Sequence, residues 1–141
     1  MTMLHSDIEL RHQQELPREQ VVSLYRECGW SSAEKPDRLL RALANSDTVI
    51  SAWQTNTLIG LGNAISDGSL VVYYPHLLVR PAFQKQGIGQ QILSALQERY
   101  ADFHQQILLS NNEAVKFYQK QGFQIPQSVI PLWIYQGRDQ Q

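Results

Sequence analysis

The sequence is poor in cysteine, in long apolar runs and in excess charge of either sign. Its only cysteine is Cys28, so neither an internal disulfide nor a cysteine-based zinc site can form. No apolar stretch approaches the roughly 20 residues that cross a bilayer, and Met1–Leu10 lacks the basic start and apolar run of a secretory signal. We therefore expect a soluble, cytoplasmic protein.

The charges nearly cancel, with 12 Lys and Arg against 13 Asp and Glu. This balance lacks the basic excess of nucleic-acid-binding proteins, and 43% hydrophobic residues exclude a disordered chain. A length of 141 residues fits one domain of ordinary size with one site. We expect a single domain over residues 1–141, a monomer or homodimer, with neither a nucleic-acid nor a membrane partner.

Periodicity in the first half predicts a short strand, two helices and then three strands joined by tight turns. The expected elements are a strand at 7–12, helices at 17–28 and 36–45, and strands at 48–54, 58–66 and 70–79. Pro75 falls inside the last of these strands and has no N–H for a ladder. We read it as a β-bulge in a central strand.

The second half predicts a helix, a strand, a second helix and a last strand. The expected elements are a helix at 88–100, a strand at 105–109, a helix at 114–121 and a strand at 129–135. Ser110–Glu113 has the spacing of a capping box before the second helix, and the polar end 136–141 is expected to fray. The element order predicts an α+β (mixed α/β) fold around one sheet.

The segment from Arg80 to Gly89 has an unusual composition for a loop between a strand and a helix. Gly87 and Gly89 lie at the start of the helix, where free N–H groups and the positive end of the helix dipole favour a phosphate. The segment lacks the Lys-Ser/Thr of a nucleotide triphosphate loop and the third glycine of a dinucleotide loop. The glycine pair alone fits an anion site or a plain tight turn equally well.

The flanking motifs decide between these readings. Leu77–Pro81, then Gln84-x-x-Gly87-x-Gly89, then Asn111-x-x-Ala114-x-x-x-Tyr118-x-x-x-Gly122-Phe123 occur in this order. Together they resemble the GNAT acyltransferase superfamily over about residues 59–123. Shorter blocks, such as Cys28–Trp30 and Val115–Tyr118, are similar to its plant and cyanobacterial arylalkylamine N-acetyltransferase branch.

The resemblance implies a mostly antiparallel sheet that splays at the cofactor strand, about four flanking helices, acetyl-CoA as co-substrate and no metal. In this family the loop amides bind the pyrophosphate, and the preceding strand bonds the pantetheine arm, with an N–H near Leu77 or Leu78 polarising the thioester. Lys85 adds a charge or is simply solvated, and Asn111 contacts the cofactor or caps a helix. The implied cofactor-binding residues are Leu77, Leu78, Val79, Gln84, Lys85, Gln86, Gly87, Ile88, Gly89 and Asn111.

The resemblance also implies catalytic roles. Tyr118 matches the tyrosine that protonates the departing thiolate, against a packing role beside Phe117. His76 is a candidate general base, Asp67 is a second candidate in a turn context, and a water chain is a third possibility. The three tryptophans are candidates either for an aromatic acceptor pocket or for the core; these are Trp30, Trp53 and Trp133.

Three functions remain open at this point. The first is an N-acetyltransferase that moves an acetyl group from acetyl-CoA to a primary amine of a small molecule by direct attack, with an aromatic amine as the narrower option. The second is a protein or peptide N-acetyltransferase, for which no charge run indicates a groove. The third is a non-catalytic acyl-CoA-binding regulator, against which the presence of Tyr118 argues.

Overall fold

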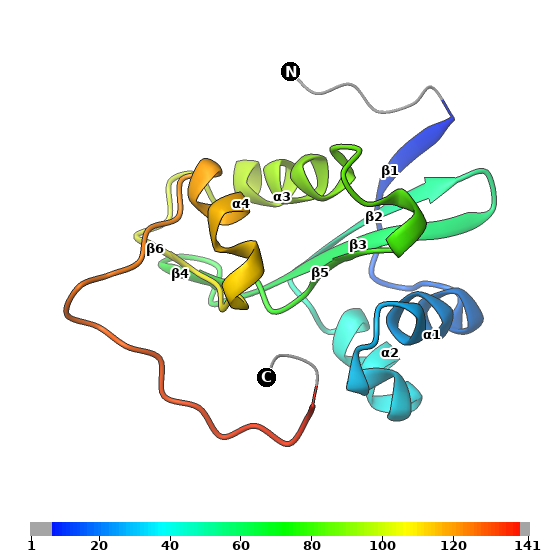
Figure 1. The fold of residues 1–141 in the computed structure, drawn as a ribbon, viewed down its shortest axis with the longest axis horizontal. Coiled ribbons are helices and arrows are strands. Elements are labelled where there is room, and N and C mark those ends of the chain that lie inside the picture. Colours follow the sequence, from blue (N-terminus) through cyan, green and yellow to red (C-terminus); the bar gives the residue numbers. More distant parts are fainter. Residues whose placement is uncertain (1–6, 139–141) are drawn as a thin grey trace.

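The computed structural model describes residues 7–138 as one twisted sheet with helices on both faces (Figure 1). The strands are β1 Ile8–His12, β2 Thr48–Gln54, β3 Thr57–Ser66, β4 Val71–Tyr73, β5 Leu77–Val79 and β6 Gln105–Ile107. The helices are α1 Arg18–Glu27, α2 Pro36–Ala44, α3 Ile88–Arg99 and α4 Val115–Lys120, with short 3-10 turns η1 Ser31–Glu34, η2 Pro81–Phe83 and η3 Asn112–Ala114. The predicted α+β class is confirmed. Within residues 7–138 no helix has the length and apolar character that a membrane span requires.

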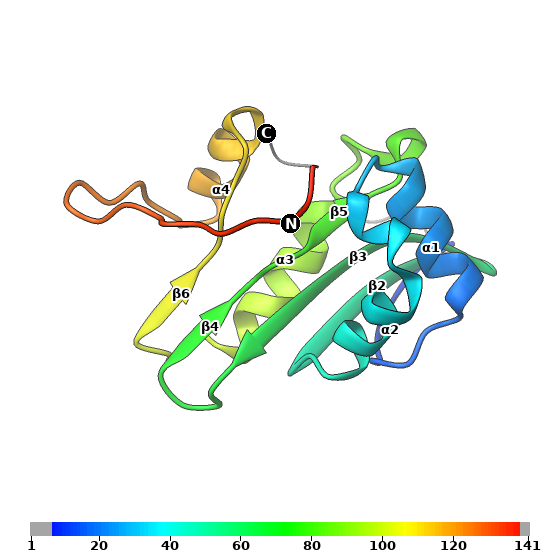
Figure 2. The same cartoon turned by 90° about the horizontal axis from the view of Figure 1, so that it is seen from below.

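The sheet places β3 at its centre. Its strands follow the order β1-β2-β3-β4-β6, and β5 pairs with β3 beside β4. All pairs are antiparallel except β4 with β6, which is parallel. Helices α1 and α2 cover one face and α3 covers the other, as the view from below shows (Figure 2).

The predicted bulge at Pro75 is confirmed by the strand register. Gly62 pairs with Leu77, and Ile65 pairs with Tyr73. Two residues of β3 therefore face three residues of the neighbouring strand, 74–76, and the extra residue divides that strand into β4 and β5. The Asn63 side-chain oxygen accepts the His76 N–H at 3.0 Å in place of a ladder carbonyl. Beyond the bulge β4 continues beside β6, whereas the outer edge of β5 pairs with no strand of the described residues.

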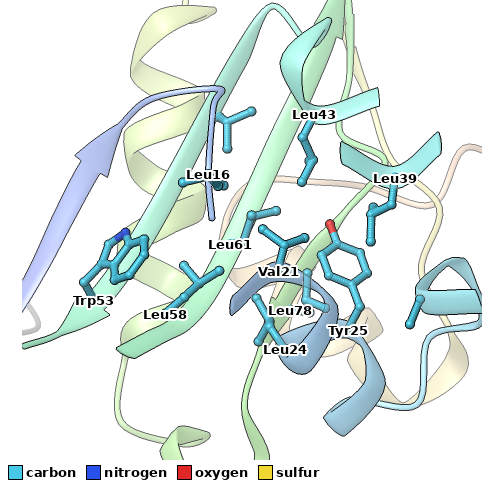
Figure 3. Close-up of a cluster of buried hydrophobic side chains, with 12 residues drawn as sticks. Leu16, Val21, Leu24, Tyr25, Leu39, Leu43, Trp53, Leu58, Leu61 and Leu78 are labelled. Atoms are coloured by element: carbon cyan, nitrogen blue, oxygen red, sulfur yellow. The ribbon is translucent and has the colours of Figure 1, made fainter. Parts of the chain in front are cut away.

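Two apolar clusters hold the layers together, one on each face of the sheet. The first joins α1 and α2 to the sheet through fully buried side chains such as Leu24, Tyr25 and Leu61 (Figure 3). The second packs α3 on β3 through Ile59 and Ile92. A side chain at Gly62 would come within 2.8 Å of Ile92 Cγ2, so the absence of one allows α3 to lie close against β3.

Two expectations for the second half are wrong. Asn111, and not Ser110, caps the turn before α4: its Oδ1 accepts the Ala114 N–H at 3.0 Å, while the Ser110 hydroxyl donates to the Asn111 carbonyl. A capping box would bring the Ser110 hydroxyl to the Glu113 N–H, whereas the Asn111 side chain, one residue further along, accepts the N–H of Ala114. The segment 129–135 is not a strand, because it runs away from the edge of β6 and so has no ladder partner.

Candidate functional site

The glycine loop joins β5 to α3 and takes an unusual backbone path. Lys85 and Gly87 both adopt left-handed conformations, with φ of 64° and 85°. Gly87 is the N-cap of α3, and no side chain of residues 7–138 caps that end of the helix. The first N–H groups of a helix have no partner within the helix. A twelve-residue helix therefore presents its positive end next to a strained loop, which is a suitable place for an anion.

Buried polar contacts hold the start of this loop. The guanidinium group of Arg80 is buried, and it donates to the Leu58 carbonyl at 2.6 Å and to Glu27 at 2.8 Å. On the far side, the Gln84 amide donates to the Val79 carbonyl at 2.9 Å. Burying a charge is costly unless it is paired, so the contacts of Arg80 fix the path of the chain between β5 and the loop.

At the outer edge of β5, some backbone groups point away from β3 and toward the side where no strand pairs with β5. The Asn63 N–H bonds the His76 carbonyl, and the Arg80 N–H bonds the Ile59 carbonyl. With the register that pairs Leu61 and Leu78, the alternation of an antiparallel ladder turns Leu78 toward β3. The same alternation turns the N–H groups of Leu77 and Val79 away from β3, toward the open side.

Three of the predicted segments meet at Gly89. A methyl group placed on this residue would lie 3.8 Å from Val79 Cγ2 and 3.8 Å from Phe117 Cζ. Strand β5, the first turn of α3 and the first turn of α4 therefore converge here. A methyl group here would make only ordinary van der Waals contact with both neighbours, so packing alone does not require a glycine at this position.

Tyr118 follows Phe117 on α4 and borders a pocket. Its ring packs edge-on against Phe117 and Phe123, with centroids 5.1 and 6.1 Å away. Burial raises the pKa of the Tyr118 hydroxyl. No residue between 7 and 138 hydrogen-bonds this hydroxyl, and the ring lines a pocket of about 710 Å³. The hydroxyl is thus protonated at neutral pH and free of structural bonds to the described residues.

His76 lies on the opposite side of β5, against α1. Its Nδ1 is 2.7 Å from the hydroxyl of Tyr25, and its ring contacts those of Tyr25 and Trp30 at 5.4 and 5.1 Å. Burial raises the pKa of Tyr25 well above its ordinary value, so this phenol is neutral. Nearby, the Cys28 thiol donates to the Val79 carbonyl at 3.3 Å, and burial raises its pKa to about 11.

Asp67 is wrong as a candidate base. Its carboxylate accepts the N–H groups of Ser69, Leu70 and Val71 at 2.8–3.1 Å, and these bonds lower its pKa. A carboxylate held by backbone N–H groups is a weak proton acceptor. Asp67 is the turn residue that its Asp-Gly context indicates.

The three tryptophans do not form one pocket. Trp53 is 4% exposed, donates to Ser51 at 2.9 Å and lies under the guanidinium of Arg11, so it belongs to the core. Trp30 packs against His76, and Trp133 borders the pocket that contains Tyr118. The expectation of a shared aromatic pocket is wrong for Trp53.

The sequence did not predict that Tyr25 and Asn63 support the site, and it indicated Arg80 only as part of a motif. Tyr25 occupies an apolar position of α1, where an aromatic residue is expected to belong to the core. Its bond to His76 joins residues 51 positions apart. The one local signal for Asn63 is a polar residue in an otherwise apolar strand.

Similarity to known proteins agrees with this geometry. The acetyltransferase (GNAT) domain family matches residues 13–128. No curated protein sequence matches the chain significantly. A GNAT-family acetyltransferase from Streptococcus pneumoniae is 27% identical, with a TM-score of 0.80 over 91% of this chain and 98% of the other.

Two aminoglycoside acetyltransferases share the fold at lower identity. AAC(6')-Iy, solved in complex with CoA, is 17% identical with a TM-score of 0.70, covering 95% of this chain and 99% of its own. An enzyme from an uncultured soil metagenome, solved with sisomicin, is 17% identical with a TM-score of 0.68, covering 92% and 97%. The glycine loop at an uncapped helix, the open edge of β5 and the family match lead to one conclusion: the chain belongs to the GNAT family of acetyltransferases.

Proposed function

We propose that residues 1–141 form one acyl-CoA N-acyltransferase domain that moves an acetyl group from acetyl-CoA to a primary amine of a small molecule. The observation that carries the proposal is the convergence at Gly89 of the anion-binding loop, the open strand β5 and the helix that bears Tyr118. Acetyl transfer needs one place where a pyrophosphate, an extended thioester arm and a proton donor come together. The convergence supports the proposal because it brings together a loop suited to the pyrophosphate, a strand edge suited to the arm and the helix that carries the proton donor.

In this proposal the loop amides from Gln84 to Gly89 bind the pyrophosphate, and the exposed side chain of Lys85 adds a positive charge. The pantetheine arm lies along β5. Leu77 and Val79 offer it outward-facing N–H groups, and the Leu77 N–H polarises the thioester carbonyl. Leu78 contributes by holding β5 against β3. The Asn111 oxygen is used as a cap, so only its amide nitrogen is available for the cofactor.

The chemistry proposed is direct attack. The amine nitrogen bonds to the thioester carbonyl carbon, the C–S bond breaks, and the sulfur leaves as a thiolate that takes a proton from Tyr118. The raised pKa of this hydroxyl keeps the proton on it throughout the neutral range. No residue between 7 and 138 bonds the hydroxyl, which leaves it available to the sulfur.

His76 is proposed as the acceptor of the proton that the amine loses. Its Nδ1 faces Tyr25, so two tautomers are open to the neutral ring. When the phenol donates to Nδ1, the ring hydrogen sits on Nε2; when Nδ1 donates to the phenol oxygen, Nε2 carries the lone pair. The second tautomer is the reactive one. Tyr25 can stabilise this tautomer, because a neutral phenol accepts a hydrogen bond as well as donating one.

The acceptor is proposed to be a small aromatic amine. The ring of Trp30 lies against His76 and is only partly buried, so it provides an apolar face for an aromatic group, whereas Tyr25 is fully buried beneath it. The near-neutral charge of the chain offers no excess of acidic groups for a polycation. The aminoglycoside enzymes share the fold at 17% identity, and polycationic acceptors are therefore the competing class.

Acetyl-CoA at 100 times its dissociation constant is expected to raise the melting temperature by roughly 5–10 °C, because ligand binding stabilises the native state. Gly87→Glu should abolish the rise, since it places a carboxylate at the anion site. The matched control is Gly68→Glu: Gly68 also has a left-handed φ, 81° against 85°, but lies in the β3–β4 turn. Thermal unfolding with and without acetyl-CoA is the measurement. No rise in the wild type would refute the proposed cofactor site.

Tyr118→Phe is expected to lower kcat by about 10², at the low end for general-acid catalysis, with the KM for acetyl-CoA retained. Stability should change by less than about 0.5 kcal/mol, because no described residue bonds the lost hydroxyl. Tyr100→Phe is the control, and the opposite effects on stability and on kcat are expected for it. Its hydroxyl bonds Asp47 and Thr48, each at 2.6 Å, so it should cost about 1–2 kcal/mol of stability and leave kcat unchanged. Unchanged kcat in Tyr118→Phe, with chemistry limiting the rate, would make Tyr118 a packing residue.

His76→Gln is expected to lower kcat by about 10² and to remove the loss of kcat/KM on the acid side, where a protonated imidazole cannot accept a proton. The measurement is a pH–rate profile for both proteins. Tyr25→Phe keeps the ring and removes the hydroxyl beside Nδ1. In this variant kcat/KM should still fall on the acid side. If His76→Gln keeps both kcat and the profile of the wild type, water is the proton acceptor.

Arylalkylamines such as tryptamine are expected to give at least about tenfold higher kcat/KM than spermidine or sisomicin. Trp30→Ala should reduce this preference, because it removes the ring beside His76. The measurement is release of free thiol from acetyl-CoA with each amine at several concentrations. Faster turnover of a polycation would overturn the aromatic assignment and leave the acetyltransferase assignment intact. Absence of turnover with every amine, together with acetyl-CoA binding, would favour a non-catalytic regulator.

A further inference from the structure

The central strand β3 buries one polar side chain among apolar ones. Asn63 is 2% exposed, and Leu61 and Ala64 beside it on the strand are fully buried. Burying an amide group is unfavourable unless hydrogen bonds replace those that it makes with water. The partners of Asn63 therefore indicate what this polar residue does in the strand.

Asn63 holds the backbone of His76 at two points. The Asn63 N–H donates to the His76 carbonyl at 3.1 Å, and the His76 N–H donates to Asn63 Oδ1 at 3.0 Å. In a regular antiparallel ladder, such an exchange of two bonds uses backbone groups alone. At the bulge the side-chain oxygen takes the place of the Asn63 carbonyl, so the orientation of this amide group decides where the backbone of His76 lies.

Ser46 fixes the orientation of the amide group. Its hydroxyl donates to the Ala42 carbonyl, in the last turn of α2, at 2.9 Å and accepts from Asn63 Nδ2 at 3.1 Å. A serine hydroxyl has one hydrogen to donate, and here the Ala42 carbonyl takes it. The NH2 group of Asn63 must therefore face Ser46, and its oxygen must face the His76 N–H. This chain of bonds ties His76 to α2.

Two groups of the proposed reaction depend on the backbone that Asn63 holds. The His76 carbonyl and the Leu77 N–H belong to one planar peptide unit and point in opposite directions. Because the Asn63 N–H keeps this carbonyl toward β3, the Leu77 N–H faces the open side. The His76 ring extends from the same backbone to the Tyr25 hydroxyl, 2.7 Å from Nδ1. A rotation of the peptide unit would therefore move both groups at once.

We propose that Asn63 is a positioning residue for acetyl transfer. Through the backbone of His76 it aligns the Leu77 N–H with the thioester carbonyl and the His76 imidazole with the attacking amine. The inference rests on the proposed function and adds to it a buried residue of β3 that acts through His76. A displacement of about 1 Å at a reacting group lowers a rate by about 10²-fold, whereas a bond that only supports the fold leaves the rate of the folded protein unchanged.

The first test compares Asn63→Leu with Asn63→Asp by steady-state kinetics with acetyl-CoA and an arylalkylamine. Leucine has a similar size and removes both side-chain bonds, so kcat is expected to fall by about 10–10²-fold while the KM for acetyl-CoA is retained. Aspartate restores an oxygen for the His76 N–H, and the Ser46 hydroxyl can turn to donate to the second oxygen. Its kcat should lie within about threefold of the wild type. Asn63→Ala removes the same bonds and takes the place of Asn63→Leu where the latter does not fold.

Thr48→Val is the matched control, because it removes a buried side-chain bond from the strand next to β3. Thr48 is 5% exposed and pairs with Ala64, one residue from Asn63, but its hydroxyl bonds Tyr100 at 2.6 Å. The melting temperature should fall by about 2–8 °C in both Thr48→Val and Asn63→Leu, and Thr48→Val should keep the kcat of the wild type. Three results overturn the proposal: an unchanged kcat in Asn63→Leu, an equal loss of kcat in Thr48→Val, or no recovery of kcat in Asn63→Asp.

The second test needs no acetyl transfer. Nuclear Overhauser contacts between the ring protons of His76 and Trp30 report where the His76 ring lies, since the two ring centroids are 5.1 Å apart. Asn63→Leu should weaken these contacts, whereas Asn63→Asp and Thr48→Val should retain them. If Asn63→Leu keeps the contacts of the wild type, the ring does not depend on Asn63 and the proposal is overturned. A wild type that acetylates no amine refutes the proposed function instead, and the ring contacts still decide whether Asn63 positions His76.

Discussion

The break between β4 and β5 is the constraint on which the rest of the site depends. One extra residue at Tyr74–His76 turns a single strand into two, and the Asn63 side chain satisfies the His76 N–H that the bulge would otherwise leave unpaired. Asn63 is itself 2% exposed and donates to the Ser46 hydroxyl at 3.1 Å. An unpaired buried N–H costs about 1–3 kcal/mol. The Asn63 side chain therefore removes this free-energy cost where β4 and β5 diverge.

Several features follow from that divergence. β4 passes on to β6, which leaves the outer edge of β5 open, while His76 turns toward Tyr25 on α1. The glycines of β3 let α3 approach closely, and the buried Arg80 fixes where the loop begins. The positive end of α3 is therefore brought to the end of β5. Separate local features combine to place the proposed anion site, an open strand edge and a tyrosine within one small region.

Much of the fold could be predicted because its signals are local. The helical stripes, the turns at 55–56 and 67–68, the bulge at Pro75 and the glycine loop each depend on a few neighbouring residues. The errors concern information that a short window does not contain. Trp53 and Trp30 look alike in the sequence, but only packing assigns one to the core and the other to His76. The apolar segment 129–135 has the composition of a strand, yet a strand must also lie beside another strand, and this segment runs away from the edge of β6. The bond between Tyr25 and His76, and the ion pair of Arg80 with Glu27, join distant positions.

The Cys28 thiol bears on the order of events in the reaction. It lies next to β5 and donates to the Val79 carbonyl, and burial raises its pKa to about 11, so the thiol form prevails at neutral pH. The thiolate, and not the thiol, is the nucleophile toward a thioester. The only cysteine of the chain is thus unsuited to carry the acetyl group as a covalent intermediate. This agrees with the direct attack proposed above, in which the amine and the thioester occupy the protein together.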